Sequence, residues 1–294
     1  IPEAEMAESV SRALGETRDA IMESAGDVAA ILIEPIQGEG GDVHWSPDFL
    51  IGLRKIADEL DVMLIFDEVQ TGVGTTGKRW AFEHLGADAI PDLVAFGKKA
   101  QVSGFMSTNR VDQVKENVFT VSGRIDSTWG GNLTDMARGR RILEVIEEEH
   151  LIENAADVGS YMVSKLREDV TSEFPQFKRV RGRGLFIGAT LPSPEERNEL
   201  LRLSLQEGLL FLSCGSDSIR FKPPLIFTKS DVDTTISILK RALARIYSPT
   251  IPQNPMAVIG GTVAAAAAAT ATATGMRLDG MKVAIIGAGN GGHA

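Results

Sequence analysis

The sequence has one cysteine, four histidines and few aromatic residues, and these shortages limit what the protein can be. A single cysteine, Cys214, cannot build a disulfide framework, which suits a reducing cytoplasm, and we expect it to be a small buried apolar residue. The histidines are scattered along the chain, so no metal site is predicted. No run of about 18 residues is apolar and free of glycine and polar breaks, so no membrane-spanning helix is expected.

Positive charges are outnumbered, with 30 Lys and Arg residues against 40 Asp and Glu residues. The net charge of −10 and the isoelectric point of about 5.0 argue against a nucleic acid or an anionic membrane as partner. The composition, 43% apolar and 24% charged, is that of a soluble globular protein. A chain of 294 residues can form one large domain and a smaller one.

Three short apolar runs, 28–35, 62–69 and 92–98, occur in the first hundred residues. Each is continuously apolar, which predicts strands buried on both faces of a parallel or mixed sheet, and the pattern over 47–60 predicts a helix between the first two. Ligands of such sheets collect at the carboxyl ends of the strands. Several polar residues follow or end these strands, and we expect them to converge: Glu39, Asp67, Glu68, Gln70, Lys98 and Lys99.

The rest of the chain predicts a second α/β region. Helical patterns cover 133–149, 152–170, 193–207 and 230–246, "FKRVRGRGLFIGATLP" predicts one strand, and "LLFLSCGSDSIRFKPPL" predicts a hairpin. The expected domains are a large-domain part over 1–150, a small α/β domain over 151–248, a Pro- then Ala/Thr-rich linker over 249–280, and a truncated dinucleotide-binding start over 281–294. Because the chain starts inside a helical pattern and stops just after a glycine motif, we expect a fragment of a longer protein.

Four motifs together resemble the class III, pyridoxal-phosphate-dependent aminotransferases of fold type I. They are "ILIEPIQGEGG", "LIFDEVQTGVGTTG", "PDLVAFGKK" and "STWGGN", and the resemblance covers roughly residues 1–246. Within the family it is strongest to the lysine ε-aminotransferase (L-lysine 6-aminotransferase) branch. It implies an α/β fold with a truncated large domain, built on a mixed or parallel sheet, and a small C-terminal α/β domain.

The resemblance implies roles for three residues at the predicted cofactor site. Lys98 would hold the cofactor aldehyde as a Schiff base and move a proton, and Asp67 would keep the pyridine nitrogen protonated. Gln70 would hydrogen-bond the phenolic oxygen of the cofactor. The alternatives are a Schiff base on Lys99, lysines on a solvated loop, and an Asp67 that only caps a turn.

The resemblance also implies phosphate and substrate contacts. Thr128 would bind the cofactor phosphate of the neighbouring subunit in a homodimer with shared active sites; the alternative is a turn before a helix capped by Asn132. Arg220 would clamp the substrate α-carboxylate, and Glu39 would pair with Arg220 while the distal amine of the substrate reacts. The lysine enzymes carry an amide at the position of Asp126, so an acid there bears on the choice of substrate.

The C-terminal "MKVAIIGAGNGGHA" is a strand pattern followed by Gly287, Gly289 and Gly292 in G-x-G-x-x-G spacing. This is the dinucleotide-binding fingerprint in its usual context, and it resembles the start of opine- or octopine-type dehydrogenases. It predicts an NAD(P) site completed by residues after Ala294. A natural enzyme fusion and a joined gene model both account for it.

The resemblance implies transfer of the ε-amino group of L-lysine to 2-oxoglutarate, giving 2-aminoadipate 6-semialdehyde and glutamate, in lysine catabolism. The alternatives are a 4-aminobutyrate or ornithine aminotransferase, an opine-type NAD(P)-dependent oxidoreductase fused to a transaminase, and a non-catalytic fragment. In fold type I enzymes part of the cofactor cradle lies before these strands. We therefore expect the 294 residues alone to be inactive.

Overall fold

The computed structural model describes residues 3–24, 26–125, 128–248 and 284–285. The chain divides into two compact units. Unit 1 contains Ile1–Gly38 and Val43–Ile152, and unit 2 contains Glu39–Asp42 and Glu153–Ala294. The linker predicted over 249–280 and most of the segment predicted to start a dinucleotide-binding domain lie outside the described residues, of which only the two-residue strand β12 (Ala284–Ile285) is described.

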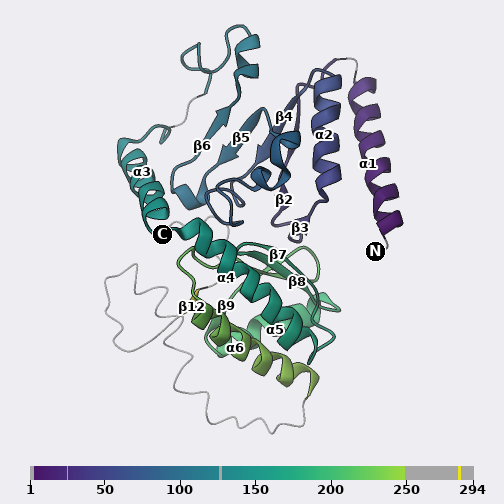
Figure 1. The fold of residues 1–294 in the computed structure, drawn as a ribbon, viewed down its shortest axis with the longest axis vertical. Coiled ribbons are helices and arrows are strands. Elements are labelled where there is room, and N and C mark those ends of the chain that lie inside the picture. Colours follow the sequence, from purple (N-terminus) through teal and green to yellow (C-terminus); the bar gives the residue numbers. More distant parts are fainter. Residues whose placement is uncertain (1–2, 25, 126–127, 249–283, 286–294) are drawn as a thin grey trace. The chain divides into compact units, whose positions relative to one another are not determined.

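Unit 1 is an α/β unit in which helices alternate with short strands (Figure 1). Its helices and strands are α1 (Glu3–Glu23), β1 (Ala30–Ile33), β2 (Ile36–Gln37), β3 (Val43–His44), α2 (Pro47–Glu59), β4 (Met63–Asp67), β5 (Leu93–Phe96), β6 (Gly104–Ser107) and α3 (Leu133–Glu148). Short 3₁₀ helices are η1 (Ala81–Ala89), η2 (Lys98–Ala100) and η3 (Asn109–Gln113).

The main sheet of unit 1 has the strand order β1-β4-β5-β6. Strands β1, β4 and β5 are parallel, and β6 pairs antiparallel with β5. The three predicted strands and the helix between the first two are confirmed, and so is the predicted mixed sheet. Because β4 and β5 are neighbours and parallel, their carboxyl ends lie at the same edge of the sheet.

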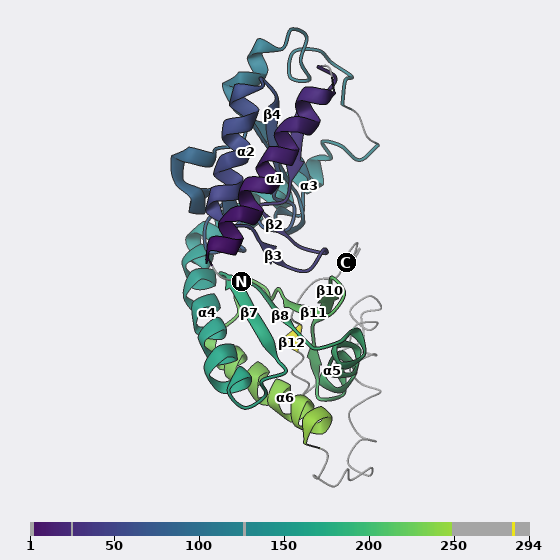
Figure 2. The ribbon, with the colours of Figure 1, turned by 90° about the vertical axis from the view of Figure 1, so that its right-hand side faces the viewer.

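The prediction that these strands are buried on both faces is wrong. Burial alternates along β4: Leu64 and Phe66 are fully buried, whereas Met63 and Ile65 are only partly buried. The buried face packs against helices α1 and α2, which lie side by side over it (Figures 1 and 2). On the other face Leu32, the β1 partner of Ile65, is 67% exposed. The described residues of unit 1 thus cover this sheet with helices on one face.

Local chemistry sets the start of α2. Ser46 accepts a hydrogen bond from the Phe49 N–H (3.3 Å) and Pro47 occupies the first turn, where its missing N–H costs nothing. The apolar face of α2 then places Leu50, Leu53 and Ala57 in the core beneath β4. These contacts pack α2 against β4.

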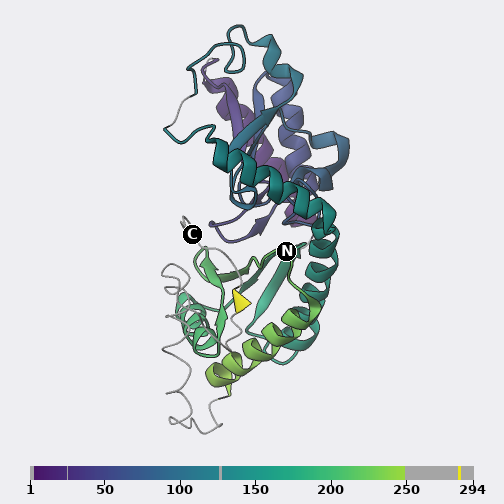
Figure 3. The same cartoon turned by 90° about the vertical axis from the view of Figure 1, so that its left-hand side faces the viewer.

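Unit 2 packs three long helices around an antiparallel sheet of order β10-β11-β8-β7. Helices α4 and α6 lie next to each other (Figures 2 and 3). Its elements are α4 (Leu151–Lys165), the π-helical turn η4 (Leu166–Thr171), β7 (Lys178–Arg183), β8 (Phe186–Thr190), α5 (Pro194–Gln206), β9 (Leu209–Leu210), β10 (Leu212–Cys214), β11 (Ser218–Phe221) and α6 (Lys229–Tyr247).

Two predictions about unit 2 have clear outcomes. The segment predicted as one strand over 177–192 is instead the hairpin β7–β8, because Gly184 takes a positive φ of 57° that lets the chain reverse. The hairpin predicted from the "CGSD" segment is confirmed as the antiparallel pair β10–β11. Cys214 is buried at 2% exposure, and burial raises the pKa of its thiol to about 12, as expected of an inert apolar residue.

Candidate active site

The two lysines stand directly after β5, in the short helix η2. Lys98 is exposed and Lys99 is half-buried, and burial lowers the pKa of Lys99. Gly97 brings the backbone close to the next segment, since a Cβ there would lie 3.0 Å from Ser103 Oγ. Of the two lysines that follow β5, Lys98 is therefore the more exposed.

Asp67 ends β4 at the same edge as Lys98. The register pairs Asp67 with Ala95 of β5, three residues before Lys98, and neighbouring strands lie about 4.8 Å apart. Asp67 Oδ1 accepts a hydrogen bond from the Val69 N–H (3.0 Å), and no described residue donates to Oδ2. The edge thus carries a carboxylate with one oxygen that no described donor uses, and Lys98 follows the neighbouring strand.

Gln70 follows Asp67 by three residues, and its side chain lies against the backbone of Gly38. A Cβ on Gly38 would approach Gln70 Oε1 to 2.7 Å, so any larger residue at position 38 would require the Gln70 amide to shift. The turn that brings Gln70 round is closed by the Gly72 N–H, which donates to the Glu68 carbonyl (2.9 Å). Asp67, Gln70 and Lys98 all belong to unit 1.

Glu68 does not join this group, contrary to the predicted convergence. It is buried at 1% exposure and accepts hydrogen bonds from the N–H groups of Ala81 (2.7 Å) and Phe82 (3.0 Å) and from the Thr71 hydroxyl (2.9 Å). Burial raises the pKa of this carboxyl. The alternating geometry of a strand explains the difference, because consecutive side chains point to opposite faces. Glu68 caps η1 instead.

Thr128 is exposed, in the turn that precedes α3. The helix is capped by Asn132, whose side-chain oxygen accepts from the N–H groups of Thr134 (2.8 Å) and Asp135 (3.4 Å). The expected cap at Asn132 is therefore confirmed, and the phosphate role of Thr128 stays a prediction. Asp126 lies outside the described residues.

Glu39 and Arg220 are brought together, and both belong to unit 2, although the strands flanking Glu39 belong to unit 1. Arg220 Nη1 donates to Glu39 Oε1 in an ion pair. The Arg220 side chain is 6% exposed and that of Glu39 is 45% exposed. Of the two partners, the carboxylate is the one in contact with solvent. The pair joins residues 181 positions apart in the chain.

Sequence reasoning missed a second ion pair, between Asp42 and Lys222, which is more buried than the first. Asp42 is 0% exposed, and Lys222 Nζ lies 3.3 Å from its Oδ1 and 3.6 Å from the centre of the Phe186 ring. Burial raises the pKa of Asp42 to about 6 and lowers that of Lys222 to about 8. The signal in the sequence is slight: two cations alternate with apolar residues in "SIRFK", and the acid directly follows "GEGG".

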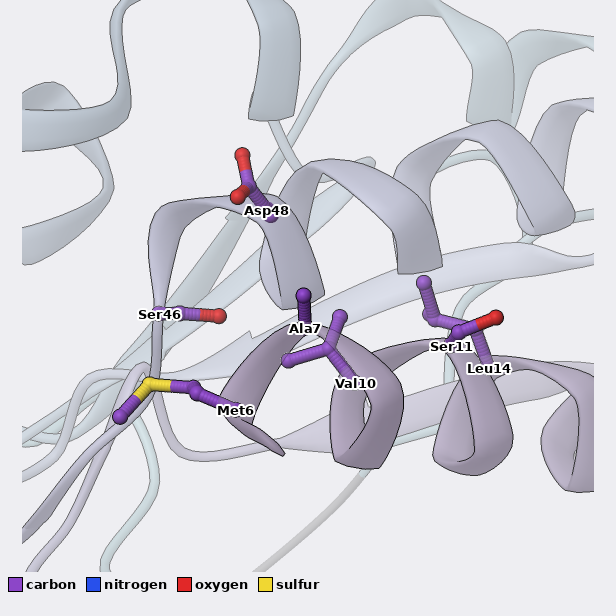
Figure 4. A pocket seen from close by; sticks show the side chains of 7 residues that line it. All are labelled: Met6, Ala7, Val10, Ser11, Leu14, Ser46 and Asp48. Carbon is purple, nitrogen blue, oxygen red and sulfur yellow. The ribbon is translucent and has the colours of Figure 1, made fainter. Parts of the chain in front are cut away.

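A shallow groove between α1 and the start of α2 has none of this chemistry (Figure 4). Its lining is mostly small and apolar, with Asp48 as the one charged side chain. A carboxylate without a cation does not suit a phosphate-bearing ligand. Among the described residues there is also no group of three or more His, Cys, Asp or Glu side chains placed to hold a metal ion. None of the helices in the described ranges combines the length and apolarity needed to cross a bilayer.

Comparison with known proteins decides the family. The model of the aminotransferase class-III family matches residues 2–243. The chain belongs to the class III aminotransferases. Its relatives include the L-lysine-epsilon aminotransferase of Mycobacterium tuberculosis, 47% identical over 83% of this chain and 54% of that protein. They also include the mitochondrial 4-aminobutyrate aminotransferase of Sus scrofa, 37% identical over 80% of this chain and 46% of that protein.

The solved structures agree with the class III assignment. The chain matches the M. tuberculosis lysine aminotransferase in the internal aldimine form with a TM-score of 0.80 and 46% identity, over 84% of this chain and 56% of that one. The predicted fold class is thereby confirmed. The chain spans about half the length of the curated relatives it matches. The predicted NAD(P) site at Gly287, Gly289 and Gly292 lies outside both the described residues and the family match and stays a prediction.

The class III family implies pyridoxal phosphate as cofactor, and the residues of unit 1 fit it. An aldehyde needs an accessible amine, which Lys98 offers. A protonated ring nitrogen needs a carboxylate oxygen, and Asp67 Oδ2 is not used by any described donor. Both groups stand at one edge of neighbouring strands. The chemistry of the donor set therefore suits this cofactor.

Proposed function

We propose that the chain carries the cofactor-binding lysine of an ω-aminotransferase that moves the ε-amino group of L-lysine to 2-oxoglutarate. The products are 2-aminoadipate 6-semialdehyde and glutamate, and the reaction belongs to lysine catabolism. The observation that carries the proposal is the placement of Lys98 and Asp67 at the carboxyl ends of the paired parallel strands β5 and β4. The identity of 47% to an enzyme named for lysine supports the donor.

Bound pyridoxal phosphate supplies an aldehyde and an electron-withdrawing ring. The Lys98 amine would hold that aldehyde and, when released, carry a proton to and from the substrate. The Asp67 carboxylate would hold a proton at the ring nitrogen, and the Gln70 amide would orient the ring through its phenolic oxygen. Thr128 would bind a phosphate group of a second subunit.

The proposal is tested by reducing the 294-residue chain with borohydride in the presence of pyridoxal phosphate and mapping the label. We expect one pyridoxyl group on the peptide that contains Lys98. Because the chain spans about half the length of its relatives, binding is the decisive measurement rather than turnover. A label spread over surface lysines, or confined to another peptide, contradicts the proposal.

A second candidate is transfer from 4-aminobutyrate or ornithine. Two observations support this candidate: the 37% identity to a 4-aminobutyrate aminotransferase and the acid at Asp126. Titration of the chain, loaded with pyridoxal phosphate, with each amino donor separates the candidates: a change in the cofactor absorbance on adding L-lysine supports the first, and a change with 4-aminobutyrate or ornithine alone supports the second.

Arg220 and Glu39 supply the next prediction. Arg220→Lys removes the planar fork that binds both carboxylate oxygens, so we expect the affinity for 2-oxoglutarate to fall about tenfold. Glu39→Gln removes the competing anion, so the affinity should rise about threefold or more. Isothermal titration of the chain with 2-oxoglutarate measures both. If the two substitutions change the affinity for 2-oxoglutarate in the same direction, Arg220 is not the residue that binds the carboxylate.

We also propose a cytoplasmic homodimer. Large exposed apolar side chains concentrate in one stretch of unit 1, where Phe119 is 56%, Trp129 76% and Leu133 85% exposed. The stretch includes Thr128, which fits a contact that reaches the phosphate of a second subunit. We expect Leu133→Asp to shift the chain from dimer to monomer in sedimentation equilibrium, while the exposed control Leu205→Asp on α5 leaves the dimer intact. A parent chain that sediments as a monomer contradicts the dimer.

A further inference from the structure

Glu39, the acid of the Glu39–Arg220 pair, belongs to a short backbone segment, residues 39–42. Several hydrogen bonds hold this segment. The Gly215 N–H donates to the Glu39 carbonyl (2.9 Å). Arg181 Nη2 donates to the Gly41 carbonyl (2.5 Å), and Arg181 Nε donates to the Asp42 carbonyl (2.7 Å). All of these groups belong to unit 2.

Arg181 is saturated by these contacts. Its remaining donors go to the Arg179 carbonyl (2.8 Å), the Thr190 hydroxyl (3.0 Å) and the Ser218 hydroxyl (3.1 Å). With the two loop carbonyls, this accounts for the five N–H donors of a guanidinium. Thr190 and Ser218 lie on paired strands β8 and β11, so Arg181 ties the segment to the sheet. A lysine has three donors on one atom and cannot span these acceptors.

Asp42 fixes the end of the segment by its side chain. Its φ of 48° is positive, and Gly188 leaves the space that its Cβ occupies, since a Cβ on Gly188 would lie 2.9 Å away. The ion pair with Lys222 is wholly enclosed on the carboxylate side. Asp42 is therefore a fully buried counter-ion, whereas the Glu39 carboxylate is 45% exposed.

We propose that Arg181 is a positioning residue that, together with Asp42, holds the backbone of residues 39–42 fixed, so that Glu39 joins and leaves Arg220 by side-chain rotation alone. The inference rests on the proposed function, in which Arg220 receives the substrate carboxylate. Arg181 acts on carboxylate binding only through the place it gives Glu39. Its loss should let Glu39 compete less well for Arg220, which raises the affinity for the ligand.

The test is a double-mutant cycle on the 294-residue chain, with the dissociation constant for 2-oxoglutarate measured by isothermal titration. We expect Arg181→Lys to tighten binding about threefold or more in the parent chain and to change it by less than about 1.5-fold in the Glu39→Gln background. Arg183→Lys, a partly buried arginine on the same strand, is the matched control and should leave the constant unchanged.

A role in stability alone predicts something else: a lower melting temperature with weaker or unchanged binding in both backgrounds. Either result overturns the proposal, and so does an equal gain of affinity with and without Glu39. Arg220→Lys separates this failure from that of the proposed function. If Arg220→Lys weakens binding while Arg181→Lys has no effect, only the positioning role is lost. If Arg220→Lys has no effect on binding, Arg220 does not bind the substrate carboxylate, and this part of the proposed function fails.

Discussion

Lys98→Ala is expected to abolish covalent capture of pyridoxal phosphate by the chain. The amine of Lys98 is the nucleophile in the proposed site, and alanine leaves nothing there to attack the aldehyde. Where turnover is measured, loss of the proton-carrying role alone should lower the rate on the order of 10²- to 10⁴-fold. Mass spectrometry after borohydride reduction, before and after the substitution, gives the direct measurement.

The neighbouring lysine provides the control. Lys99 is half-buried while Lys98 is exposed, so Lys99→Ala should retain the label on the same peptide. If the label survives in Lys98→Ala and disappears in Lys99→Ala, the roles of the two lysines are exchanged. In that case the lowered pKa of Lys99 is the property that selects the nucleophile. If the label survives in both variants, the edge of β5 is not the cofactor site.

Asp67→Asn is expected to weaken the binding of pyridoxal phosphate about 10- to 100-fold. The carboxylate at the end of β4 makes a charged hydrogen bond in the proposed site, and a contact of that kind contributes about 1.5–3 kcal/mol. Asparagine keeps the shape and can still accept from the Val69 N–H, so the turn after β4 should persist. Fluorescence titration of the chain with pyridoxal phosphate measures the change.

Substitution of a surface acid in the same unit is the control for the change in net charge. Asp88 is exposed in η1, and Asp88→Asn changes the charge of the chain by the same amount. It should leave the affinity within about twofold of the parent, as expected for a surface substitution. Equal losses in the two variants would mean that Asp67 acts through the overall field and not through the ring nitrogen.

Strand β4 shows what an apolar sequence pattern can predict and what it cannot. The apolar run over 62–69 correctly predicts a strand, but it does not tell which residues point which way. Alternation places Phe66 and Glu68 in the interior and Asp67 on the less covered side. Glu68 and Asp67 are both acids in one motif, yet one is a buried cap and the other stands at the sheet edge.

The cluster in unit 2 illustrates the opposite case. Its three charged residues are far apart in sequence: Asp42, Arg181 and Lys222. In the sequence, nothing distinguishes any of them from a surface charge. Their contacts depend on β8 and β11 pairing and on residues 39–42 joining unit 2. Long-range partners of this kind follow from packing, because a buried charge must find its counter-ion wherever the fold has placed one.

The sequence by itself predicted the strands β1, β4 and β5, the helices α2 and α3, and the family, and it named the lysine, acid and glutamine proposed for the cofactor site. These are local properties, because periodicity, caps and short motifs depend on residues that are close together in the sequence. Only the tertiary structure decided that Glu68 is turned away, that Asp42 pairs with Lys222, and that the backbone carrying Glu39 is held by Arg181. The reason is that strand register and burial, which set these pairings, arise from contacts between distant parts of the chain.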